Sequence, residues 1–154
     1  MKKKKLLLLI ILVGLFTLTG CMKDVKHSAS AKLNVGEDDV AIMTVDLTGG
    51  YSVEFASGAV YFYEGEQSDE TLCHGFIITK EEYDEEVAYF DGQDDLEGEY
   101  KTLKDGGFYY KTDSNIEYFF PSEDGFYVKV VVKETNLGKA NTIYSRFKAS
   151  KVGE

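Results

Sequence analysis

The adjacent residues Cys73 and His74 are the first place where side chains could do chemistry, because an imidazole can activate a cysteine nucleophile. The pair lies in the apolar run 72–79, which predicts a β-strand. Neighbouring residues of a strand point to opposite faces of the sheet, so the thiol and the ring cannot easily meet. We therefore expect no catalytic residue here and interpret Cys73 as a small buried hydrophobe.

Carboxylates crowd the segment 91–99, and carboxylate oxygens are the ligands that calcium prefers. Their spacing does not match the EF-hand loop, which needs carboxylates at alternate positions, a central glycine and a terminal glutamate. A zinc site needs several Cys or His ligands, and residues 40–154 offer only one of each. We expect a solvated loop and no cofactor. The weak candidates for a cation site are Asp91, Asp94, Asp95 and Glu97.

Two other kinds of site can be considered from residue types. A pair of carboxylates could hydrolyse a glycosidic bond, but with 27 acidic residues in the chain any one pair is uninformative. Tyrosines could form a binding surface, although aromatic residues in strands more often build the sheet and its core. The candidates for such a surface are Tyr61, Tyr63, Tyr109, Tyr110, Tyr118 and Tyr127.

The N-terminus has the layout of a secretory signal: four lysines at positions 2–5 and then the apolar run 6–16. This run is shorter than the roughly 20 residues that span a bilayer. The residues that follow, Leu18-Thr19-Gly20-Cys21, resemble the lipobox of bacterial lipoproteins. The resemblance implies a signal peptide over residues 1–20, cleavage after Gly20 and a diacylglycerol on the thiol of Cys21.

The charge of the chain limits its partners. The formal net charge is −10, and removing residues 1–20 with their four lysines leaves −14. Such a surface repels nucleic acid and anionic lipid and attracts divalent cations or a basic partner. We expect the protein on the outer side of the cell membrane, held by the lipid on Cys21. The lysine-rich composition, with Arg146 as the one arginine, suits a Gram-positive host.

The mature chain divides into a tether and one domain. Residues 21–39 are polar and predict a lipidated N-terminus and a flexible tether, whereas residues 40–154 have the texture of a single folded domain. Alternating or aromatic runs predict strands over 40–47, 51–56, 59–64 and 72–79. The segment 126–133 alternates so that one face is buried and the other mostly wet.

A helix is predicted over residues 79–90. Thr79 and Glu82 form a capping-box pattern, and Tyr83, Val87 and Phe90 form an apolar stripe. A second, shorter helix is predicted over 139–147, followed by a last strand. Helices set between runs of strands indicate an α+β fold: a largely antiparallel sheet of six to eight strands with two helices packed on it.

This order of elements resembles the small α+β domains of the PsbP and Mog1 type. The residues that carry the resemblance are 51–55, the turn at Gly58 and the segment 143–147. The chain departs from that family in its shorter length and its single proline. The resemblance implies a scaffold and no particular chemistry.

We expect a non-catalytic function, because the domain is well patterned for folding and poor in catalytic groups. It would be a binding or accessory module for another envelope protein or a small ligand. Two alternatives remain at this point: a carboxylate-dependent hydrolase of the cell envelope, and an acidic cation-binding surface protein.

Overall fold

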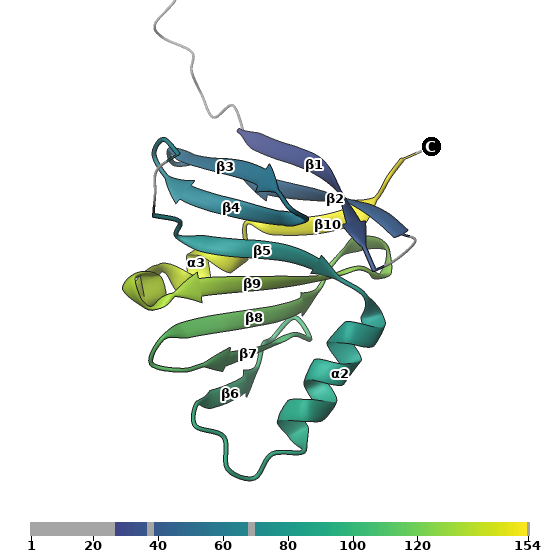
Figure 1. Ribbon diagram of the computed structural model, residues 1–154, viewed down its shortest axis with the longest axis vertical. Helices are drawn as coiled ribbons and strands as arrows, with labels where there is room; N and C mark the ends of the chain where they lie inside the picture. Colours follow the sequence, from purple (N-terminus) through teal and green to yellow (C-terminus); the bar gives the residue numbers. More distant parts are fainter. Residues whose placement is uncertain (1–26, 37–38, 68–69, 154) are drawn as a thin grey trace, which may run out of the picture.

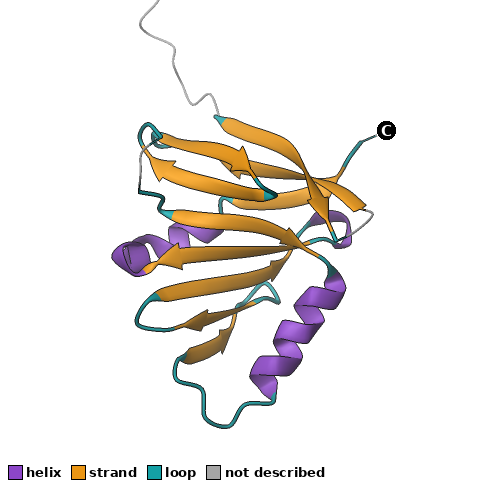
Figure 2. Ribbon diagram, in the orientation of Figure 1, coloured by secondary structure: helices purple, strands orange, loops and turns teal. Residues whose placement is uncertain are grey.

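The computed structural model describes residues 27–36, 39–67 and 70–153, which form two antiparallel sheets and two α-helices (Figures 1 and 2). The strands are β1 (Ser28–Val35), β2 (Asp39–Asp46), β3 (Tyr51–Ala56), β4 (Ala59–Glu64), β5 (Cys73–Ile78), β6 (Glu99–Thr102), β7 (Phe108–Lys111), β8 (Asn115–Pro121), β9 (Tyr127–Lys133) and β10 (Phe147–Lys151). The α-helices are α2 (Lys80–Asp91) and α3 (Ala140–Tyr144), and short 3-10 turns lie at Glu123–Gly125 and Glu134–Lys139.

The larger sheet has seven strands in the order β3-β4-β5-β9-β8-β7-β6, all antiparallel to their neighbours. Strand β9 alternates as its sequence predicts: Val128, Val130 and Val132 are fully buried, while Lys129 and Val131 on the other side are half-buried. We call the side of Val130 the inner face and the side of Val131 the outer face.

The smaller sheet has the order β1-β2-β10 and joins the two ends of the described chain. The interpretation of residues 28–35 as part of a flexible tether is therefore wrong. Strand β1 pairs with β2 along its whole length and buries Leu33 and Val35. The sequence does not predict β1 clearly, because the first two inward-facing positions of the strand are Ala29 and Ala31, which add little to an alternating hydrophobic pattern.

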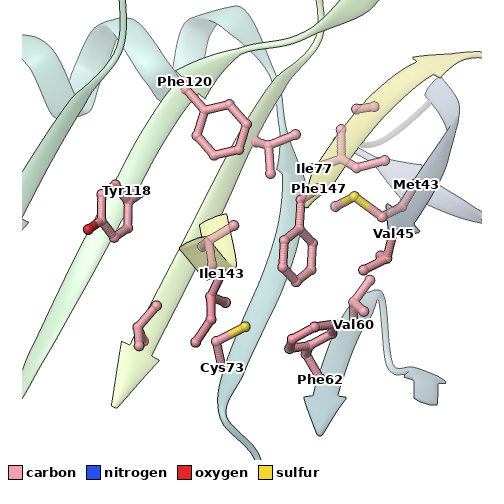
Figure 3. Close-up of a cluster of buried hydrophobic side chains, with 14 of the residues drawn as sticks. Met43, Val45, Val60, Phe62, Cys73, Ile77, Tyr118, Phe120, Ile143 and Phe147 are labelled. Atoms are coloured by element: carbon pink, nitrogen blue, oxygen red, sulfur yellow. The ribbon is translucent and has the colours of Figure 1, made fainter. Parts of the chain in front are cut away.

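The main core lies between the small sheet and the inner face of the large one (Figure 3). Phe147 of β10 reaches into it and lies 5.6 Å from Phe62 of β4, ring centre to ring centre. Its ring rests on Gly75, where a Cβ atom would come within 2.5 Å of it. A glycine inside a strand often marks a bulge or a close approach of another group, and here the structure shows the second: the Phe147 ring needs the room.

Helix α2 begins as its sequence predicts. The Thr79 side chain accepts a hydrogen bond from the Glu82 backbone N–H, and the Glu82 carboxylate accepts one from the Thr79 N–H. The apolar stripe of the helix meets the outer face at its β6–β8 end. There the Phe90 ring lies 5.7 Å from Phe108 and 4.7 Å from Tyr110.

The fold is broadly α+β, as predicted, but its second layer is different. The structure has ten strands in two sheets, and the small sheet, not a pair of helices, forms most of the layer on the large one. Helix α3 has five residues instead of the predicted nine and lies behind β9 in Figure 1. It contacts β8 through Tyr118, whose hydroxyl donates a hydrogen bond to the Asn141 side chain at 2.7 Å.

The contact at Gly75 generates the first prediction. Gly75→Ala will lower the free energy of unfolding by about 1–3 kcal/mol, because the added methyl group collides with the Phe147 ring in a filled core. Urea unfolding measures the loss. Gly138→Ala is the matched control, since its Cβ would meet nothing within 4 Å. Equal unfolding midpoints for the two variants would contradict this packing.

Candidate functional site

The structure places Cys73 and His74 on opposite faces of the large sheet, as the strand geometry predicts. Cys73 is fully buried on the inner face, and burial raises the pKa of its thiol. A buried thiol of raised pKa is a poor nucleophile, because the thiolate is the reactive form. His74 lies on the outer face, so the two side chains do not form a nucleophile–base pair.

His74 is half-buried among polar and aromatic neighbours. Its Nε2 lies 3.1 Å from the Thr71 hydroxyl, and its ring meets the Tyr61 ring edge-on at 4.9 Å. The pKa of His74 is lowered, first by burial and then by the positive charge of Lys133. The ring is therefore held in its neutral form more strongly than a solvated histidine.

The acidic residues of the segment after α2 are not gathered into a metal site. Within the described ranges, no group of three Asp, Glu, His or Cys side chains is arranged to hold a metal ion. Asp91 accepts a hydrogen bond from the Tyr100 hydroxyl at 3.1 Å. Asp94, Asp95 and Glu97 are exposed. A side-chain hydrogen bond from Lys101 lowers the pKa of the neighbouring Glu99. A carboxyl group that acts as a general acid needs a raised pKa instead.

The six candidate tyrosines do not share one surface. Tyr118 is fully buried and stacks on Tyr144 of α3, and Tyr109 lies beside it on the inner face. The other four lie toward the outer face, where Tyr127 stacks on Tyr83 of α2 with ring centres 4.3 Å apart. Most of these rings therefore build the fold.

The lipobox residues Leu18, Thr19, Gly20 and Cys21 lie outside the described residues, so the signal peptide and the lipid anchor stay predictions. Among the helices of the described ranges, none has the length and apolar character to cross a membrane.

A groove of about 710 Å³ lies on the outer face, beside α2. We call it the α2 groove. Helix α2 covers the β6–β8 end of this face, and on the side viewed in Figure 1 no described helix or strand crosses β5 and β9. The floor of the groove is formed by the half-buried side chains of Phe76, Ile78 and Val131, together with Phe119.

One wall of the α2 groove is a polar stripe of the helix: Glu82, Glu85, Glu86 and Tyr89. These residues follow one another at the spacings i, i+3, i+4 and i+7, which place side chains along one line parallel to a helix axis. Tyr89, at the end of the line, is 57% exposed. Among the described residues, Tyr89 and Val40 are the two large hydrophobic side chains that are exposed.

Lys129 also lines the groove, and its positive charge is paired with two carboxylates. Its Nζ lies 2.8 Å from Glu117 and 3.6 Å from Glu86, and 4.7 Å from the centre of the Phe119 ring. The lysine side chain is only 25% exposed. A cation is thus held between carboxylates and an aromatic ring, an arrangement whose attraction grows as water is excluded.

The polar side chains that line the α2 groove are three glutamates, Tyr89 and a lysine that is already paired with carboxylates. Sequence reasoning missed this groove. The available signals were the second face of α2 and the apolar residues on both faces of β5, where a one-sided sheet would alternate with polar ones.

No family model matches the chain, and neither the curated proteins nor the solved structures contain a match. The resemblances to bacterial lipoproteins and to PsbP and Mog1 domains therefore stay predictions.

The environment of His74 generates a prediction on pH. The unfolded chain binds a proton on this histidine near the ordinary pKa of about 6.5, whereas the folded chain does so only at lower pH. The contribution of His74 to the free energy of unfolding is therefore complete above a pH of about 6.5, and it decreases as the pH falls from there toward the lowered pKa of the folded chain.

We expect the melting temperature to fall less between about pH 7 and about pH 5 in His74→Gln than in the unsubstituted chain. His27→Gln is the control, because His27 is exposed and should leave the slope unchanged. Parallel pH profiles for His74→Gln and the unsubstituted chain would show that His74 is not held neutral.

Proposed function

We propose that this protein is a non-catalytic binding module, anchored to the outer side of the cell membrane through a lipid on Cys21, that binds a partner in the α2 groove. The observation that carries the proposal is the groove itself. Its floor of phenylalanine, isoleucine and valine is half-buried beside a helix, whereas the open face of an antiparallel sheet is usually polar.

The two alternatives receive less support from the arrangement of side chains. A carboxylate hydrolase needs one acid with a raised pKa facing a second carboxylate, whereas Glu86 of the groove and Glu117 both face Lys129. A calcium-binding surface needs several oxygen ligands converging on one point, which the described acidic residues do not provide.

The proposal is tested by photo-crosslinking in intact cells. A benzophenone amino acid replaces Tyr89 at the groove or, as the control, Val40 on the small sheet; both side chains are exposed. We expect a crosslinked partner from position 89 and none from position 40, because only the first lines the groove.

A third sample carries the Cys21→Ala substitution together with the label at position 89. It should lose the crosslink, because the module would no longer be placed at the membrane. Crosslinking at both positions, or at neither, would contradict the α2 groove as the binding site. A crosslink that survives Cys21→Ala would contradict the role of the anchor.

A further inference from the structure

We propose that the α2 groove binds an amphipathic helix of a partner protein that is apolar toward the sheet and basic toward α2. This inference rests on the proposed function and adds the chemistry of the partner. It follows from three features of the groove: its hydrogen-bonded floor, the line of glutamates on its wall and the charge that this line leaves unmatched.

The floor favours a helix over an extended segment. Strand β5 is paired with β4 and β9, and β9 is paired with β5 and β8. Their backbone groups are therefore used inside the sheet, and a partner strand could not extend it at this place. A helix satisfies its own backbone groups and offers an apolar stripe to a surface, which suits a floor of Phe76, Ile78 and Val131.

The wall favours a helix that lies alongside α2. Glu82 to Tyr89 extends over about 10 Å at 1.5 Å per residue, or two helical turns. Two helices that pack side by side contact each other through such a line of residues, with axes about 8–10 Å apart. The exposed ring of Tyr89 lies at the end of the line, where it can cover the last turn of the partner.

The charges favour a basic partner. Glu82 is used in the capping box and Glu86 lies near Lys129, but Glu85 makes no hydrogen bond or ion pair with any described residue. A lysine or arginine of the partner opposite Glu85 would repeat the arrangement already present at Lys129. A second copy of this chain suits the groove less well, because each copy is strongly acidic and would bring its own glutamates.

The test uses the full chain in nanodiscs of neutral lipid and three dye-labelled peptides of leucine with one charged residue type. The first places lysine and leucine at helical spacing, the second replaces lysine by glutamate, and the third alternates lysine and leucine as a strand would. Fluorescence anisotropy measures binding, with empty nanodiscs as the blank. We expect the helical lysine peptide to bind more tightly than both others.

Variants of α2 locate the binding. Glu85→Lys should weaken binding of the helical lysine peptide about five- to tenfold, because an attraction becomes a repulsion at this exposed position. Glu81→Lys makes the same charge change on the same helix outside the groove and should alter binding by about twofold or less.

Several results would overturn the inference: equal binding of the glutamate or the strand-patterned peptide, equal losses in the two variants, or a dimer in sedimentation that Glu85→Lys dissociates. These results are distinct from failure of the proposed function. A crosslink at position 89 without binding of the helical lysine peptide would keep the groove as the site and reject only this partner chemistry.

Discussion

The two sheets meet where the Phe147 ring packs on the bare backbone of Gly75. This contact joins the last strand of the chain to the middle of the large sheet, and through β10 it carries β2 and β1 with it. The ring fills the space above the glycine, and Met43, Val45 and Ala149 of the small sheet are fully buried in the same core. Packed interiors tolerate little change in volume, so this one missing side chain sets the spacing of the layers.

The elements that cover each face of the large sheet determine which part of its surface is open to a partner. The small sheet and α3 occupy the inner face, and α2 covers only the β6–β8 end of the outer face. The outer surface of β5 and β9 carries half-buried apolar side chains that line the α2 groove. The groove is thus a consequence of how the chain divides two sheets and two helices between two faces.

Much of the fold could be predicted from local patterns. The capping box of Thr79 predicts the start of α2, and the alternation of residues 126–133 predicts β9 and its buried face, because each pattern is contained within a few residues of sequence. Strand β1 was missed because its inward alanines carry little signal, and the place of β10 beside β2 was missed because the residues that pair there lie about a hundred positions apart. The site was missed for a related reason. A groove is formed by residues of α2, β5, β8 and β9 together, and no single segment shows it.

One face of the large sheet is filled by the core, and the other is open beside α2. Val130 and Val131 test this difference directly, since they are neighbours on β9 that point to opposite faces. Each is replaced by cysteine, and the rate of thiol labelling is measured in the native protein, where Cys73 is buried. The structure predicts fast labelling of Val131→Cys and protection of Val130→Cys until the protein unfolds. Protection of both thiols would mean that the outer face is covered, and fast labelling of both would mean that the two sheets do not pack as described.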